Sequence, residues 1–276
     1  MKEFIQAFEQ LNNTSVKNRR IILYDLNSLL ADCTQDLYDT NTKFPDAGLF
    51  EKLIIQIINH NLSIYNLSKG ANISIKKTNI LYNDITAVYS IARLQIETYV
   101  NLSYLFFIDI GISQELRICI YKIQGLNQQI LLTRHHPKTH PQISKMRNEL
   151  AKELRKLRSL EEFKLASRGQ KNKYIKPKYA RLIKPVEVYH LMKIGDLSKT
   201  HSLYSNHIHS EYISIRQLNS AFKNQNESLE GFSTVLMICS RITSSIIKNL
   251  VTKYKLENES FAKKDKVIRE MIKLLT

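Results

Sequence analysis

The sequence predicts an almost entirely α-helical protein. Apolar residues recur with a period of about 3.6 along most of the chain, and the polar–apolar alternation of a half-buried strand is nearly absent. Only 7 Gly and 5 Pro interrupt the 276 residues, a composition that excludes collagen-like chains and fits a packed core. We therefore expect a single all-α domain over 1–276, a helical bundle with its core at about 75–255 and additional packed N-terminal and C-terminal helices.

Turn signals and periodicity together define the first helices. Two helices are expected at about 2–11 and 15–31, and a third at about 47–68. Asp46 is placed to cap the start of the third helix, and Gly70 has the conformational freedom to end it.

The two most apolar runs, Ile85 to Ile110 and Val235 to Val251, are nearly long enough to cross a membrane. Each run contains at least two charged residues, which are costly at the centre of a bilayer. We therefore expect core helices at about 77–108 and 230–256, and no transmembrane segment.

The middle of the chain is broken into shorter pieces, because four of the five prolines lie between 137 and 185. The bundle core is expected from the helices near 77–108, 113–132, 199–222 and 230–256. The remaining helices are expected at about 142–166, 186–194 and 259–274.

The net charge of +16 is concentrated in the second half of the chain. Residues 1–140 contain 14 Lys and Arg against 12 Asp and Glu, whereas residues 141–276 contain 27 against 13. The segment 163–184 has no acidic residue, and the rings of Phe163, Tyr174 and Tyr179 are interleaved with its cations. Such a pattern suits single-stranded nucleic acid, although an acidic protein, a membrane surface or a solvated lysine-rich loop are alternatives. The candidate nucleic-acid-binding residues are Lys164, Arg168, Lys171, Lys173, Tyr174, Lys176, Lys178, Tyr179, Arg181 and Lys184.

No cofactor or metal site is expected from the motifs. The cysteines, Cys33, Cys119 and Cys239, show no CxxC spacing and are interpreted as buried reduced thiols of a cytoplasmic protein. The cluster from His135 to His140 has no nearby Cys, Asp or Glu to complete a metal shell, so we interpret it as a basic loop. The chain also lacks Walker A, GxGxxG, HExxH and GxSxG motifs, so the enzyme classes that depend on them lose their usual support.

A polar stripe interrupts the apolar helix near 77–108. Tyr89, Arg93 and Glu97 are spaced four residues apart and share one helix face, where Arg93 and Glu97 can pair. Buried charges need partners, and Arg117, Arg241 and the stretch 204–211 are candidates. One interpretation is purely structural, because such pairs fix helix register. In the other, a histidine reaches the pair, and we favour His209 over His207 for that position.

A family resemblance rests on short motifs. Arg93-x3-Glu97 in a long apolar helix, Leu116-Arg117 and Tyr204-Ser205-x3-His209 together resemble a bacterial family of all-helical proteins of unknown function. That family is similar in layout to the HEPN superfamily (higher eukaryotes and prokaryotes nucleotide-binding). The chain departs from HEPN nucleases in one respect. Their signature is an Arg, a polar residue and a His after four to six intervening positions, and the match at Arg134–His140 is no more than chance predicts, with Pro137 breaking any helix there.

The resemblance implies an all-helical HEPN-like core and metal-independent RNA cleavage, often in a defence or toxin system. It also implies a homodimer or a cognate protein partner. His209 would then be the general base, Arg93 would stabilise the phosphorane, and Glu97 would hold Arg93 in place. The alternative hypothesis is a non-catalytic helical module that binds nucleic acid, RNA above all, or protein. The candidate catalytic residues are Arg93, Glu97, Arg117, Tyr204, Ser205 and His209.

Overall fold

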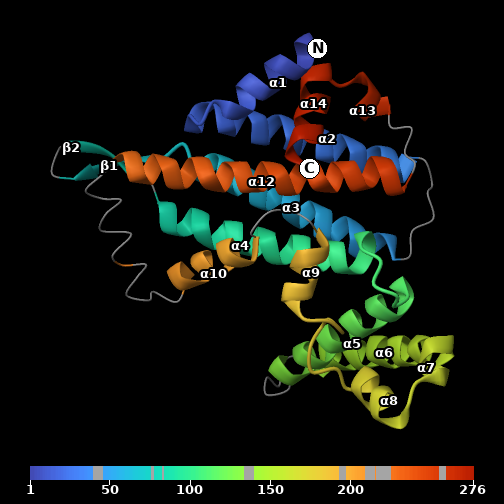
Figure 1. Ribbon diagram of the computed structural model, residues 1–276. Coiled ribbons are helices and arrows are strands. Elements are labelled where there is room, and N and C mark those ends of the chain that lie inside the picture. The colour runs from blue at the N-terminus through green and yellow to red at the C-terminus, as the bar shows by residue number, and fades with distance from the viewer. Residues whose placement is uncertain are drawn as a thin grey trace. The chain divides into compact units, whose positions relative to one another are not determined.

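The computed structural model confirms an α-helical protein (Figure 1). It describes residues 1–39, 46–75, 78–82, 84–133, 140–192, 197–208, 215, 225–254 and 259–276. These residues form two compact units. Unit 1 contains residues Met1–Leu102 and Lys193–Thr276, and unit 2 contains Ser103–Met192. The predicted core at 75–255 draws on both units, and a single domain over 1–276 stays a prediction.

Four long helices form the centre of unit 1. They are α2 (Val16–Asp39), α3 (Ala47–Leu67), α4 (Ile85–Leu102) and α12 (Gln225–Lys253), and each packs against its neighbours through fully buried side chains such as Leu26, Ile54 and Ile96. Shorter helices cover this bundle. Helix α1 (Lys2–Asn12) packs on α14 (Lys266–Leu275), α13 (Glu259–Lys263) on α2, and α10 (Leu197–Ile208) on α4. Two N-terminal helices therefore belong to the bundle itself, which corrects the prediction that they pack around it.

A buried polar layer joins the four central helices. Asn61 on α3 donates to Asn27 Oδ1 on α2 at 2.8 Å and to Thr243 Oγ1 on α12 at 2.9 Å. Gln95 on α4 donates to Asn61 Oδ1 at 2.7 Å. Buried polar groups lose free energy unless they are hydrogen-bonded, so this layer fixes the register of all four helices.

The structure has a β-hairpin where the sequence predicted the start of the helix at about 77–108. Gly70, with φ of 74°, turns the chain after α3, and the strands β1 (Ala71–Ile75) and β2 (Thr78–Tyr82) then pair antiparallel with Ile73 opposite Ile80. Helix α4 begins only at Ile85, where the Asp84 carboxylate accepts from the backbone N–H of Ala87 at 2.9 Å. The predicted cap by Asp46 is confirmed, because its carboxylate accepts from the Leu49 N–H.

Unit 2 is built on a helical hairpin. Helices α5 (Gln114–Thr133) and α6 (His140–Ser159) pack together, and their core contains Leu116, Ile120 and Leu157. The unit begins with a π-helical turn, η1 (Ser103–Phe107), and also contains α7 (Glu161–Leu165), α8 (Arg168–Ile175) and α9 (Pro185–Met192). The helix predicted at 142–166 is thus divided at Leu160. Helix α8, which begins with a capping box of Ser167 and Gln170, was not predicted.

The predicted burial of the cysteines is confirmed, because Cys33, Cys119 and Cys239 are all buried and none of them forms a disulfide. Burial raises the pKa of Cys119 to about 11 and also raises that of Cys239. Within the described part of the chain, one helix, Ser228–Lys253, is apolar and long enough to span a membrane. Of its most apolar window, 61% is buried inside the protein, as in core helices generally, so this helix is weak evidence for a span.

Candidate functional site

A cluster of four polar side chains lies where α10 packs on α4 in unit 1. Arg93 Nη2 is 2.9 Å from Glu97 Oε1, and Arg93 Nε donates to Ser205 Oγ at 2.8 Å. His201 Nε2 lies 3.1 Å from the same Glu97 Oε1. We call Arg93, Glu97, His201 and Ser205 the α4–α10 cluster.

Solvent reaches this cluster. The exposed fractions of the side chains are 22% for Arg93, 40% for Glu97 and 23% for His201. The Glu97 carboxylate orients both a guanidinium and an imidazole, because its Oε1 interacts with each of them. A carboxylate-bound imidazole can transfer a proton, and an adjacent guanidinium can stabilise negative charge. The arrangement therefore contains the groups of an acid–base site.

The structure brings together three of the predicted catalytic residues: Arg93, Glu97 and Ser205. His209 lies outside the described residues. The sequence interpretation missed His201, although one signal was present. His201 and Ser205 are four residues apart, as Arg93 and Glu97 are, so two such pairs on packed helices can face each other.

Tyr204, another of the predicted catalytic residues, packs inside unit 1, and its catalytic role stays a prediction. Its side chain is 1% exposed, and its ring stacks on that of Tyr89 with centroids 4.7 Å apart. Burial also raises the pKa of the Tyr204 hydroxyl. Helix α12 approaches this ring pair at Gly231, where a Cβ would come within 2.6 Å of the Tyr89 hydroxyl. The stacked pair of Tyr89 and Tyr204 therefore holds α10 against α4, and this packing keeps the residues of the α4–α10 cluster close to one another.

Arg117 is buried in unit 2, and its catalytic role stays a prediction. Its guanidinium is 4% exposed and donates from Nη1 to the carbonyls of Tyr104 and Ile108, the latter at 2.9 Å. These carbonyls lie at the end of η1, where backbone acceptors lack partners within the helix. Arg117 therefore caps the π-helical turn.

We expect Arg117→Ala to lower the free energy of unfolding by about 2–4 kcal/mol, because it removes a buried donor from two carbonyls. The measurement is urea denaturation followed by circular dichroism. Arg155→Ala, an exposed arginine of the same unit, is the control and should change stability by less than about 0.5 kcal/mol. Equal stabilities of the two variants would show that the cap contributes nothing.

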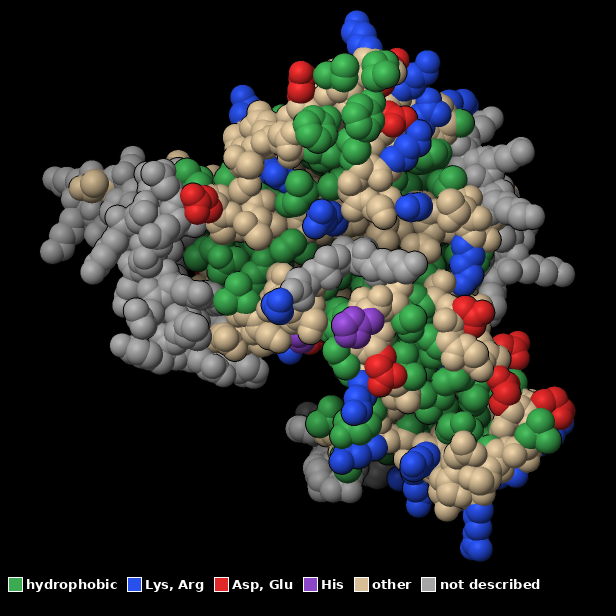
Figure 2. All heavy atoms as spheres, viewed as in Figure 1, with side chains coloured by type: hydrophobic (Ala, Val, Ile, Leu, Met, Phe, Trp, Pro, Cys, Tyr) green, Lys and Arg blue, Asp and Glu red, His purple; other side chains and the backbone are tan. Residues whose placement is uncertain are grey.

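Unit 2 has most of the net charge of the protein. Residues 103–192 contain 18 Lys and Arg against 7 Asp and Glu, a net +11 of the total +16. Helix α6 turns Ile143, Met146 and Leu157 inward, and its many cations occupy the other sides. Figure 2 shows Lys and Arg side chains around α8, with most of the acidic side chains in view along another edge of this unit.

The predicted nucleic-acid-binding segment, 163–184, contains the end of α7, the whole of α8 and the chain that leads to α9. Phe163 is buried and Tyr174 is half-buried, and both pack in the unit 2 core with ring centroids 6.4 Å apart. Tyr179, by contrast, is 67% exposed. Lys164 pairs with Glu161, while Lys171 donates to the Lys164 carbonyl at 2.7 Å. The exposed cations of the segment are Lys164, Arg168, Lys173, Lys176, Lys178 and Lys184, while Lys171 and Arg181 are half-buried.

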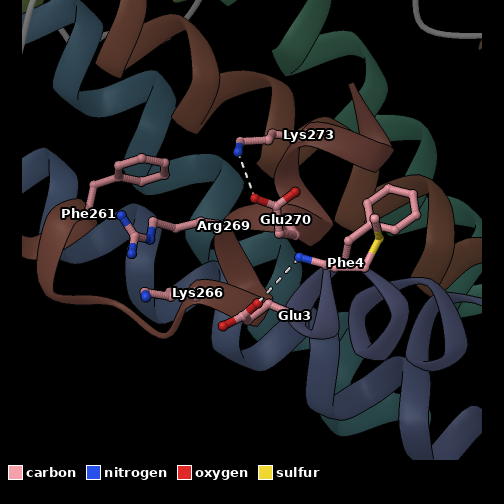
Figure 3. Close-up of a pocket in the computed structure, with 8 residues that line it drawn as sticks. Glu3, Phe4, Phe261, Lys266, Arg269, Glu270 and Lys273 are labelled. Carbon is pink, nitrogen blue, oxygen red and sulfur yellow. Dashed lines mark hydrogen bonds and ion pairs between the residues drawn. The ribbon is translucent and has the colours of Figure 1, made fainter.

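Neither a metal centre nor a charge-selective pocket stands out among the described residues. No group of three or more His, Cys, Asp and Glu within them has the arrangement of a metal site. His135, His136 and the side chain of His140 lie outside the described part. Figure 3 shows a pocket of about 340 Å³ between α1, α13 and α14. Three cations and two carboxylates line it, and Lys273 pairs with Glu270, so the pocket does not select one sign of charge.

The fold and these groups define an α-helical protein with one strongly basic unit and one partly exposed Arg–Glu–His cluster. No family model matches the chain, and no curated protein or solved structure matches it.

Proposed function

We propose that this protein binds nucleic acid, RNA above all, and that unit 2 contacts the phosphate backbone. The proposal rests on the high net positive charge of helices α6 to α8 and of the segment 176–184 that follows them. Residues 140–184 contain 14 Lys and Arg against 4 Asp and Glu, and most of these cations are exposed. Neutralising phosphates with such cations releases condensed counterions, which drives binding. RNA is favoured because the sequence motifs resemble those of a family that is similar in layout to HEPN proteins.

Binding is tested by fluorescence anisotropy with a labelled RNA of about 20 nucleotides in KCl from about 50 to about 200 mM. For four phosphate contacts on a single strand, the affinity should fall about 50-fold over this range. Competition with polyglutamate distinguishes nucleic acid from acidic proteins in general. Absence of saturable binding at the lowest salt, or equal competition by polyglutamate, would contradict the proposal.

A second function, metal-independent RNA cleavage, is favoured by the geometry of the α4–α10 cluster. The observation is that Glu97 Oε1 orients both His201 and Arg93. In this proposal His201 takes the proton of a ribose 2′-hydroxyl, and the 2′-oxygen forms a bond to phosphorus. The bond from phosphorus to the 5′-oxygen breaks, and this oxygen takes a proton from water, while the protonated His201 later loses its proton to solvent. Arg93 stabilises the charge on the phosphorane, while Glu97 holds both partners.

Cleavage is tested by incubating the protein with cellular RNA in EDTA and analysing the RNA on a gel. We expect fragments that end in a 2′,3′-cyclic phosphate. Intact RNA under conditions where binding is saturated would remove this second function and leave the first in place.

A further inference from the structure

The segment 176–184, which connects α8 to α9, is held against the body of unit 2. The Leu182 backbone N–H donates to the Tyr104 hydroxyl at 3.1 Å, and Tyr104 belongs to the buried turn η1. Burial raises the pKa of this hydroxyl, and its oxygen accepts the bond from Leu182 in the neutral form. The anchor places the residues just before Leu182 on the surface in a defined position.

Tyr179 is the exposed aromatic side chain of unit 2, as far as the structure describes this unit. Its ring is 67% exposed, whereas Phe163 and Tyr174 pack into the core. Of the three rings that the sequence interleaves with cations, only this one is therefore positioned to receive a base from solution. Single exposed rings are common on protein surfaces, so the exposure of Tyr179 makes its ring accessible to a base, and it is the cations around it that indicate a contact.

Cations precede and follow Tyr179 in the sequence, and one of them lies near its ring. Lys178 Nζ is 5.4 Å from the ring centroid of Tyr179, and the side chains of Lys176 and Lys184 are exposed. The sequence contains no acidic residue between Glu162 and Glu187. A ring flanked by cations matches the alternation of bases and phosphates in a nucleic-acid strand.

An exposed aromatic ring distinguishes single-stranded from double-stranded nucleic acid, because it stacks only on a base whose face is accessible. In a duplex, each base is already stacked and paired, so its face is not accessible to a side chain. In a single strand, a base can turn out and stack on an aromatic ring, which stabilises binding. Phosphate contacts alone do not make this distinction.

We propose that Tyr179 stacks on an unpaired base while Lys176 and Lys178 hold the adjoining phosphates, so that unit 2 selects single-stranded nucleic acid. This inference rests on the proposed nucleic-acid-binding function and names its substrate class.

The test compares the affinities of Tyr179→Ala for a single strand and for a duplex of the same length. We expect about 5- to 100-fold weaker binding of the single strand and an unchanged affinity for the duplex, while Tyr179→Phe binds like the parent. Tyr24→Ala, at an exposed tyrosine of unit 1, is the control and should leave both affinities unchanged.

A second readout uses the absence of tryptophan from the sequence. Tyr179→Trp introduces one fluorophore at the proposed contact, and a stacked base should quench it when single strand is added, but not when duplex is added. Tyr24→Trp should respond to neither. If single strand and duplex bind equally and Tyr179→Ala behaves like the parent, the inference is wrong while nucleic-acid binding stands. If neither form binds, the proposed function itself fails.

Discussion

Replacing Lys173, Lys176 and Lys178 together by glutamate should weaken RNA binding about 100-fold or more. All three side chains are exposed on or just after α8, so the change removes three cations without disturbing the core. It also places three anions where phosphates are proposed to lie. Each lost phosphate contact on a single strand should reduce the slope of log affinity against log salt by about 0.7. The measurement is the same anisotropy titration, repeated at several salt concentrations.

The matched control changes the charge by the same amount in unit 1. Lys17, Lys52 and Lys248 are exposed there, and their replacement by glutamate should weaken binding only about threefold through the overall field. Circular dichroism checks that both triple variants keep their helices. Equal losses of affinity in the two variants would mean that net charge, and not the surface of unit 2, determines binding.

Replacing His201 by alanine should lower the rate of RNA cleavage about 100- to 10,000-fold, because general acid–base catalysis contributes this much. The protein should stay folded, since a partly exposed pair such as His201 and Glu97 contributes less than about 1 kcal/mol. The rate is measured in EDTA from the release of fragments with cyclic phosphate ends.

Two further histidine variants show whether a loss of cleavage is specific to His201. His190→Ala removes an exposed histidine of α9 and should cleave like the parent. His209→Ala tests the histidine that the sequence motif favoured. Loss of cleavage in His209→Ala together with full activity of His201→Ala would assign the base to His209 and contradict the role of His201.

The helices that the sequence predicted well are those whose ends have local signals. Helix α3 begins at its Asp46 cap, and α5 and α9 begin within one residue of the predicted start. The hairpin of β1 and β2 was missed because each strand has only five residues, too few for alternation to outweigh the helical pattern around it.

The sequence predicted only part of the candidate site. It could not show which face of α10 packs on α4, because this depends on the rotation of α10 about its own axis. Neighbouring helix residues point about 100° apart, so Ser205 can face Arg93 only if Tyr204 turns elsewhere, and it turns into the core. This rotation also places His201 beside Glu97. Sequence spacing within one helix predicts the pair of Arg93 and Glu97, but it does not predict which face of a second helix packs on that pair.

Composition also could not show which rings of the basic segment 163–184 pack in the core and which are exposed. Phe163 and Tyr174 resemble Tyr179 as interleaved rings in the sequence, yet they cover the hairpin of α5 and α6. Their burial depends on contacts with residues far away in the chain, such as Leu116 and Ile123. Likewise, the sequence made Arg117 a candidate partner for Glu97, because it does not show that the carbonyl of Ile108, after the π-helical turn, accepts a hydrogen bond from Arg117.

The most direct test of nucleic-acid binding by unit 2 is ultraviolet crosslinking of the full chain to a single-stranded RNA, with the crosslinked residues identified by mass spectrometry. We predict that the crosslinked peptides come from residues 140–192, with the peptide that contains Tyr179 among them. Crosslinks confined to unit 1, or none in an RNA complex that is saturated, would contradict the account.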